Sequence, residues 1–434
     1  IRQLSKVSRM IQNFKKINNI AGWVIFAIAA FVYIKTLEPT VSFWDCGEYI
    51  ATSVKLQVGH PPGAPFFQMV GNFFSQLAFG DVTMQAYWVN MVSALSSAFT
   101  ILFLFWTVTA LAKKLAEKTG TLDQGKMIAI FGAGAVGALA YTFSDSFWFS
   151  AVEGEVYAMS SFFTAAAYWA VLKWEEVVDD DKYANRWLVL IAFMVGLSVG
   201  VHILVFLTIP AIGMVYYFKK YPNPTTGGFI LANVLSILVL GVVFKVIIPL
   251  VLKLLGMMEI LFVNNLNLPF NSGTIFTVLA LTGLAVYGLM YTKKTNKPLL
   301  NQAILGFIFL MIGYSSFVML AIRSNANTPI DENNPEDALS LLDYYNRTQY
   351  GDWPILYGRS YNAEYDREEP FKDASPTRVR GYIVLDGDKE VASFRKKAQA
   401  EEYVAASGNA SLDIDGQYIV SNDGKASVPN YAAE

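Results

Sequence analysis

The chain has 434 residues, of which 54% are apolar, 15% aromatic and only 16% charged. A soluble domain usually carries about 25% charged residues, so this composition argues against an ordinary soluble enzyme. Residues 323–434 hold 20 acidic and 12 basic side chains, whereas residues 1–322 hold 15 acidic and 21 basic. We therefore expect an all-α polytopic membrane domain over residues 1–322, followed by a small extracytoplasmic soluble tail over residues 323–434.

The single cysteine and the two histidines exclude several kinds of site. Cys46 alone cannot form a disulfide framework, a cysteine-rich zinc site or a two-cysteine redox motif. His60 and His202 are too few for a histidine-rich metal site. No basic surface stands out, so nucleic acid is not an expected partner. The chain begins with Ile1 rather than methionine, and we expect it to be a fragment of a longer protein.

Long apolar runs predict the membrane-spanning helices. A bilayer core is about 30 Å thick and requires roughly 20 apolar residues per helix. Residues 187–218 form one run with Gly196, Gly200 and His202 near its middle, for which we expect a bent pair of short helices. The hydropathy then predicts about nine transmembrane helices, near residues 18–36, 85–111, 127–143, 154–173, 187–200, 202–218, 230–253, 274–292 and 299–322.

Basic residues in the loops predict the orientation of these spans. Lysines and arginines gather before the first span and after the second, fourth, sixth and eighth, which all lie on one side if there are nine spans. The opposite side carries Lys55, Lys253 and little else. The positive-inside rule then places the N-terminus in the cytoplasm and the tail outside. A single span over residues 187–218 would weaken this bias.

Two further segments have recognisable patterns. Apolar residues at helical spacing predict a helix over Pro65–Phe79 that lies along the outer membrane surface. In the tail, the turn-forming sequence Asp386-Gly387-Asp388 separates short apolar runs. We expect a small α+β structure there, with a helix over Lys396–Ala406 and a strand over Gln417–Val420.

Asp45 and Glu48 are the first candidates for chemistry. They lie three residues apart just beyond the first span, and on a helical turn they would share a face. Near the bilayer surface one carboxyl can hold a proton while the other stays ionised, which suits general-base catalysis. A solvated loop turn explains the same spacing equally well. Cys46, next to Asp45, is expected to be a small packing residue rather than a nucleophile.

His60, Glu155 and His202 each admit two interpretations. Three prolines after His60 fix the backbone, so the loop either holds His60 against a ligand phosphate or caps the surface helix. An acid at Glu155, near the start of the fourth span, is costly unless it faces a water-filled cavity or a partner. Alternatively, Glu153 and Glu155 lie at a helix N-terminus, where the dipole favours negative charge. A lone histidine such as His202 is more often a packing residue than a catalyst.

A glycine pattern in the third predicted span imitates a nucleotide-binding motif. Residues Gly132 to Gly137 match the dinucleotide fingerprint, but no predicted strand precedes them. Small residues that let membrane helices approach closely explain the pattern better.

Four motifs taken together resemble a known family: Phe43-Trp44-Asp45-Cys46-Gly47-Glu48, His60-Pro61-Pro62-Gly63, Glu155-Val156-Tyr157-Ala158 and Gly196-Leu197-Ser198-Val199-Gly200-Val201-His202. This family is common in Bacteroidetes, was formerly catalogued as a domain of unknown function, and comprises C-type membrane glycosyltransferases that use lipid-linked sugars. It is related to the protein O-mannosyltransferases. The resemblance covers roughly residues 15–325, and family members are usually longer.

The resemblance implies a GT-C-like fold and an inverting transfer of a sugar, with mannose as one candidate. The donor would be a polyprenyl-phosphate sugar and the acceptor a hydroxyl, either of a protein serine or threonine or of a glycan. The reaction would take place at the outer face of a bacterial inner membrane, with a periplasmic tail. Transfer would be metal-independent or weakly metal-dependent, and no other cofactor is implied.

The resemblance also implies roles for individual residues. Asp45 would be the base, whereas the role of Glu48 stays open because Cys46-Gly47 separates the two acids, which are adjacent in protein O-mannosyltransferases. Glu155 would bind the sugar or orient the acceptor. The donor phosphate needs a cation, and the candidates on its side of the membrane are Lys55, His60 and Arg323. His202 is also expected to bind substrate. Tyr157, in the third motif, is included with Glu155.

A transporter or flippase for a lipid-linked or small polar solute is the alternative. Transporters tend to place ionisable residues at mid-membrane on broken helices. Here the acids gather in predicted outer loops, and only Lys245 and His202 are expected to lie deep. Convergence of Asp45, Glu48 and Glu155 on one cavity would favour catalysis, whereas an open path across the bilayer would favour transport.

Overall fold

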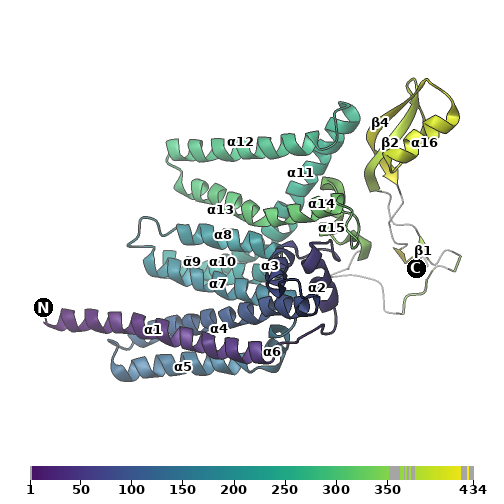
Figure 1. Cartoon of the computed structure of the whole chain (residues 1–434). Coiled ribbons are helices and arrows are strands. Elements are labelled where there is room, and N and C mark those ends of the chain that lie inside the picture. The colour runs from purple at the N-terminus through teal and green to yellow at the C-terminus, as the bar shows by residue number, and fades with distance from the viewer. Residues whose placement is uncertain are drawn as a thin grey trace. The chain divides into compact units, whose positions relative to one another are not determined.

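The computed structural model describes residues 2–350, 362–365, 367–368, 371–372, 377–421 and 428–429 (Figure 1). The chain folds as two compact units that are interleaved in sequence. The first comprises Ile1–Gly59, Ala64–Phe244 and Gly288–Met319, and the second comprises His60–Gly63, Lys245–Tyr287 and Leu320–Glu434. The expected division after residue 322 separates a membrane domain from a soluble tail, and it stays a prediction.

The first unit is helical. Its long helices lie side by side with roughly parallel axes (Figure 1). They are α1 (Arg2–Lys35), α4 (Gln85–Glu117), α5 (Gln124–Thr142), α7 (Val156–Val177), α8 (Arg186–Val199), α9 (Thr208–Lys220), α10 (Thr226–Val242) and α13 (Pro298–Tyr314). The shorter helices are α2 (Cys46–Lys55), α3 (Pro65–Ser75) and α6 (Asp145–Ala151), with 3₁₀ segments at Gln76–Ala78, Val82–Met84 and Ile203–Leu207.

Within the described residues, seven helical stretches are long and apolar enough to cross a membrane. They are Asn13–Lys35, Val82–Glu117, Gln124–Thr142, Ile203–Lys220, Thr226–Asn265, Ser272–Lys294 and Pro298–Asn325. The helix α8 is apolar but shorter, and α7 is not among the seven. The multi-pass helical architecture is therefore confirmed, whereas the number nine stays a prediction.

Three local predictions are confirmed in this unit. The run 187–218 is broken, since α8 ends at Val199 and α9 begins at Thr208. A helix forms at Pro65, although its regular part ends at Ser75; its position on a membrane surface stays a prediction. The segment from Gly132 to Gly137 is helical.

Small residues bring the helices of the first unit close together. A Cβ added at Gly134 would lie 2.7 Å from Thr109 Cγ2, so α5 approaches α4 closely at this residue. A Cβ at Gly196 or Gly313 would overlap backbone atoms across the α8–α13 contact. Gly132 and Gly137 instead face open space. The close-approach explanation of the glycine pattern therefore holds for Gly134 alone among these three.

The second unit joins a helical hairpin to a small sheet. Its helices are α11 (Ile248–Ile260), the first part of α12 (Ser272–Lys294), the end of α14 (Val318–Asn325), α15 (Ala338–Tyr345) and α16 (Lys397–Ser407), and its strands are β2 (Thr377–Asp386), β3 (Lys389–Phe394) and β4 (Leu412–Ser421). These strands form an antiparallel sheet in the order β3-β2-β4, and the short strands β1 (Phe371–Lys372) and β5 (Val428–Pro429) pair separately. The predicted tail helix, strand and turn at Gly387 are confirmed.

The sheet packs on the turn between α11 and α12. Asn264 donates from Nδ2 to the Tyr418 carbonyl and accepts from the Tyr418 N–H, both at 3.0 Å. The Phe270 ring meets the rings of Tyr382 and Tyr418 edge-on. The Arg380 guanidinium lies over Phe270 at 4.8 Å from the ring centroid. The sheet is thereby attached to the hairpin through both polar and aromatic contacts.

Glu259 holds the same turn from inside. Its side chain is fully buried, and its carboxylate accepts hydrogen bonds from the backbone N–H of Asn271 and, at 2.8 Å, of Thr274. The Thr274 hydroxyl donates to it at 3.0 Å. These N–H groups open α12 and have no partner within the helix. Glu259 therefore satisfies the first turn of α12 and is itself compensated for burial.

We predict that Glu259→Gln lowers the free energy of unfolding by about 1–3 kcal/mol, because the amide replaces one acceptor oxygen by a donor and leaves helix N–H groups unsatisfied. Unfolding of the detergent-solubilised protein measures this change. Glu117→Gln, at the more exposed end of α4, serves as the control and should change stability by less than about 0.5 kcal/mol. Equal losses in both variants would contradict the assigned role.

Candidate functional site

The candidate site is built around the first turn of α2. Asp45 is the N-cap residue of this helix and is exposed, and Glu48 lies half-buried in its first turn. Negative charge is favoured at both positions by the helix dipole. The side chain of Asp45 makes no capping hydrogen bond to the helix backbone. The two carboxylates therefore start from one helical turn, as the spacing predicts.

The residue before Asp45 has an unusual conformation. Trp44 has φ of 61°, in the left-handed region, and its side chain is 88% exposed. Bulky residues rarely adopt this region, and holding one there costs about 1–3 kcal/mol. Such strain persists only where the surrounding structure fixes the backbone. The turn that presents Asp45 is therefore imposed by contacts elsewhere.

The carboxylate of Glu48 lies against Gly59. A Cβ built on Gly59 would overlap Glu48 Oε1, and it would also lie 3.4 Å from Thr52 Cγ2. The absence of a side chain at Gly59 thus leaves the space that the carboxylate occupies. No sequence pattern pointed to this glycine, because its contact depends on how the chain after α2 turns back.

Tyr49 follows Glu48 in α2. Its side chain is buried, and burial raises the pKa of its phenol, which the charges of Glu155, Asp45 and Glu48 raise further. Tyr49 is therefore a protonated hydrogen-bond donor at neutral pH. The charges of all three carboxylates thus act on one phenol. Sequence analysis missed Tyr49, since a tyrosine in a short amphipathic helix ordinarily signals packing.

Glu155 approaches from the N-terminus of α7. It is the N-cap residue, 6% exposed, and its Oε2 accepts a hydrogen bond from the Val156 N–H at 2.7 Å. The Ser93 hydroxyl of α4 donates to the Glu155 carbonyl at 3.2 Å. The interpretation as a helix-terminal acid is thus confirmed. The position is also compatible with a site, because the charge of Glu155 helps to raise the pKa of Tyr49.

Glu153, two residues earlier, bonds to the loop before α2. Its Oε2 accepts from the Ser42 hydroxyl at 2.7 Å. Burial, together with the charges of Glu153 and Glu155, raises the pKa of Cys46 to about 12. The thiol therefore stays protonated at neutral pH. The expectation that Cys46 is a packing residue agrees with its full burial.

Tyr157 and His202 form a second group beside Glu155. Their ring centroids lie 5.3 Å apart, with Tyr157 in the first turn of α7. His202 is the N-cap of the 3₁₀ segment, and its Nδ1 accepts from the Leu204 N–H at 3.3 Å. This bond leaves the proton of a neutral imidazole on Nε2. The break between α8 and α9 therefore fixes the orientation of His202.

The remaining candidates are Lys55, His60 and Arg323. Lys55 is exposed in the last turn of α2, a helix roughly 15 Å long, at the end opposite Asp45. His60 and Arg323 belong to the second unit. There the His60 carbonyl accepts from the Tyr344 hydroxyl at 3.3 Å, and Arg323 is half-buried in the last turn of α14.

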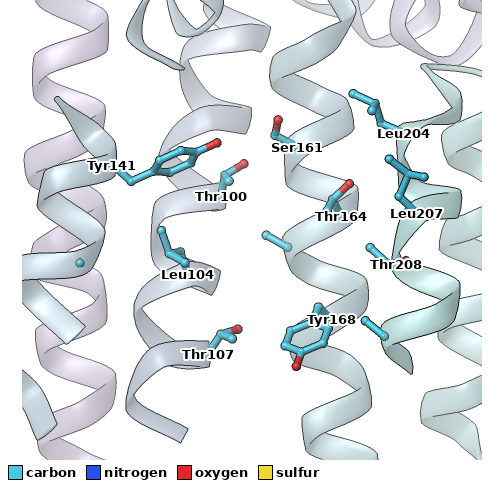
Figure 2. Close-up of a pocket in the computed structure, with 13 residues that line it drawn as sticks. Thr100, Leu104, Thr107, Tyr141, Ser161, Thr164, Tyr168, Leu204, Leu207 and Thr208 are labelled. Atoms are coloured by element: carbon cyan, nitrogen blue, oxygen red, sulfur yellow. The ribbon is translucent and has the colours of Figure 1, made fainter. Parts of the chain in front are cut away.

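A cavity of about 680 Å³ lies between the helices of the first unit (Figure 2). Leucine and alanine side chains, one glycine and seven hydroxyl-bearing side chains line it, and none of its lining residues is charged. In Figure 2, Tyr141, Thr100 and Ser161 border one end and Thr107 and Tyr168 the other. Its lining includes Leu204, Leu207, Thr208 and Ala211 from the segment after His202.

Comparison with known proteins concerns the segment that holds this site. Residues 45–225 match the family described as the protein O-mannosyl-transferase TMEM260 N-terminal domain. The protein O-mannosyl-transferase tmem260 of Dictyostelium discoideum is 26% identical over 142 residues, which cover 33% of this chain and 15% of that protein. The mouse protein O-mannosyl-transferase TMEM260 is 29% identical over 175 residues, which cover 40% of this chain and 22% of that protein.

No solved structure matches the chain significantly. The matched segments span less than a quarter of the length of these two curated relatives. The family match contains Asp45, Glu48, Glu155, Tyr157 and His202. The matches therefore support an O-mannosyltransferase-like family for the segment that builds the candidate site.

Proposed function

We propose that this chain is part of a C-type membrane glycosyltransferase of the Bacteroidetes-type family, which transfers a sugar from a polyprenyl-phosphate donor to a serine or threonine hydroxyl of a protein with inversion. The observation that carries the proposal is the pair of carboxylates Asp45 and Glu48 on the first turn of α2, with the buried Glu155 acting electrostatically on the same Tyr49, within the segment similar to proteins named O-mannosyl-transferases. Mannose is the proposed sugar on the same grounds.

Asp45 is the proposed general base. As the acceptor oxygen forms its bond to the anomeric carbon, the hydroxyl proton passes to the Asp45 carboxylate. The bond between the anomeric carbon and the phosphate oxygen breaks, and its electron pair leaves with the phosphate. An exposed carboxylate at a helix N-terminus suits this role because an acceptor protein can reach it. A phosphate leaves with little acid assistance, so one base and cationic stabilisation suffice.

The other residues would position the reactants. Tyr49 remains protonated and therefore donates a hydrogen bond rather than accepting the proton. Glu48 and Glu155 would bind sugar hydroxyls or orient the acceptor, and Tyr157 with His202 would border the donor. Lys55, His60 and Arg323 remain the proposed cations for the phosphate.

The uncharged cavity is the proposed place for the donor's hydrocarbon chain. Its walls come from α4, α5, α7 and the segment Ile203–Lys220, which contains α9. Of these, α4, α5 and Ile203–Lys220 belong to stretches able to span a membrane. A cavity without charged lining suits a hydrocarbon and excludes the phosphate. Leu204 connects the cavity to the Tyr157–His202 pair, because it lines the cavity and its backbone N–H donates to His202 Nδ1. The head group would emerge beside this pair.

This arrangement would operate at the outer face of a bacterial inner membrane, with the N-terminus in the cytoplasm and the tail in the periplasm. The transporter or flippase alternative gains no support from the first unit. Its acids near Tyr49 lie at the N-termini of α2 and α7 rather than midway along a broken helix.

We predict that Asp45→Asn lowers turnover by about 10²–10⁴-fold, because an amide cannot accept the acceptor proton. The assay uses purified full-length chain in liposomes, a panel of polyprenyl-phosphate sugars and a peptide rich in serine and threonine. Asp145→Asn, an exposed acid in the first turn of α6, should retain full turnover. Unchanged turnover of Asp45→Asn would reject the base, and an inactive wild type with every donor would reject the proposed function.

We predict that Gly59→Ala lowers turnover about tenfold or more while the unfolding temperature stays nearly unchanged. The new methyl group displaces the Glu48 carboxylate, a flexible group that moves at little cost to stability, yet a misplaced site residue costs activity. Gly132→Ala is the matched control, because open space surrounds its Cβ. The role of Glu48 is wrong if Gly59→Ala and Gly132→Ala show the same turnover.

We predict that Ser161→Phe raises the KM for a long-chain donor about tenfold, because the ring fills the cavity that would hold the hydrocarbon. A short-chain analogue of the same sugar phosphate should show an unchanged KM. Val136→Phe, at a 71% exposed position of α5, controls for the added ring. An equal rise of KM for both donors would contradict the placement of the chain.

A further inference from the structure

We propose that a pocket between α11, α15 and β2 binds the head group of a phospholipid that carries a phosphodiester and a primary ammonium group. The pocket has a volume of about 300 Å³. Small-molecule sites measure about 300–1,000 Å³, so this pocket has room for a head group but not for two acyl chains. All of its lining residues belong to the second unit. Its occupancy therefore does not depend on sugar transfer by the first unit.

The charges that line the pocket define the class of ligand. Lys253 of α11 and Arg378 of β2 contribute two cations, and Asp343 of α15 contributes one acid. Lysine and arginine side chains bind phosphate oxygens through charge-assisted hydrogen bonds. The acid in the same pocket repels a purely anionic ligand and attracts an ammonium group. The lining therefore matches a zwitterionic head group, in which a phosphate and an ammonium lie close together.

Arg378 is held at the pocket by the contacts that attach the sheet. Its Nη1 donates to the Tyr418 carbonyl at 3.3 Å, which uses one of the five N–H groups of the guanidinium. Tyr418 in turn pairs through its backbone N–H and carbonyl with Asn264, in the turn after α11. The guanidinium is thus oriented before any ligand arrives, which lowers the entropic cost of binding.

The rest of the pocket wall is apolar. A Cβ built on Gly256 would lie 3.3 Å from Leu339 Cγ, so α11 and α15 approach each other closely beside the pocket. Met257, Ile260 and Leu342 contribute apolar side chains to the lining. An apolar wall lowers the local dielectric constant, so the charges of the pocket act on a ligand more strongly than they would in water.

One exposed face of α11 supplies a surface for the acyl chains. Leu250, Lys253 and Met257 share this face at helical spacing. Leu250 is 47% and Met257 57% exposed, and both belong to Thr226–Asn265, a stretch able to span a membrane. The span expected over residues 230–253 ends at Lys253. A lipid on this face would therefore place its chains along Leu250, its phosphate at Lys253 and its ammonium in the pocket.

The test is a titration of the purified, delipidated chain in detergent, with bound lipid counted by native mass spectrometry. Dioleoyl phosphatidylglycerol keeps the phosphodiester and the chains of dioleoyl phosphatidylethanolamine but lacks the ammonium. We expect the Kd for the ethanolamine lipid to be about tenfold lower. Glycerophosphoethanolamine, the same head group without chains, should bind at least about tenfold more weakly than the whole lipid. Equal Kd values for the two lipids overturn the zwitterionic ligand, and tight binding of the free head group overturns the lipid.

Met257→Trp tests the pocket without changing its charge. The larger side chain fills space that the head group would occupy, so the Kd for the ethanolamine lipid should rise about tenfold. Met290→Trp, at a 67% exposed position of α12 outside the pocket, is the matched control and should bind as the wild type does. Equal affinity of the two variants overturns the assignment to this pocket.

Asp343→Asn tests the partner of the ammonium. The amide carries no charge, so the Kd values for the ethanolamine and glycerol lipids should come within about twofold of each other. Asp388→Asn removes the same charge from the exposed turn between β2 and β3 and should keep the tenfold preference. A preference that survives in Asp343→Asn, or that disappears equally in Asp388→Asn, overturns the role of Asp343.

Discussion

A carboxylate removed from water must find hydrogen-bond donors, and this requirement organises the structure at its most important points. Glu155 takes the Val156 N–H at the start of α7, and Glu259 takes the N–H groups that open α12. In both places an acid and a helix N-terminus satisfy each other, since each is costly when buried alone. Glu153 meets the same requirement with a side-chain donor, Ser42, from a loop far away in the sequence. The ends of helices and the geometry of the candidate site thus depend on the same interaction.

The site is consequently built where helices begin rather than along their length. The first turn of α2 supplies Asp45 and Glu48, the first turn of α7 supplies Glu155 and Tyr157, and the break before α9 supplies His202. Each of these positions lies within the segment that resembles the O-mannosyl-transferases. The matched segment therefore contains the acids Asp45, Glu48 and Glu155 of the first unit. The sheet and the α11–α12 hairpin lie outside it.

Sequence analysis could place the elements because local patterns determine them. Hydropathy located the long helices, and Gly200 with His202 marked the break in the run 187–218. The tail helix and the strand β4 followed from spacing and turn residues. Hydropathy could not decide the number of spans, because α7 mixes apolar and polar side chains and α8 is short. The acids near Tyr49 were recognised individually because each stands out against an apolar background.

The contacts between these residues could not be predicted, because they join distant parts of the chain. Ser42 and Glu153 are 111 positions apart, and no sequence pattern around either residue predicts the hydrogen bond between them. The role of Gly59 becomes visible only in the structure, where the Glu48 carboxylate occupies the space that a side chain would need. Tyr49 is ordinary as a residue of a small helix and becomes significant through its surroundings. The sequence thus identified the charged groups, whereas their relations required the structure.

The attachment of the tail has a consequence for how that sheet behaves. Strands at the margin of a sheet present unpaired N–H and C=O groups, which invite pairing with another chain. Asn264 uses its amide to pair with both groups of Tyr418, as an adjacent strand would. An incoming strand would have to displace the helical hairpin before it could extend the sheet past this residue. The same side chain that fastens the tail thereby protects one of its margins from self-association.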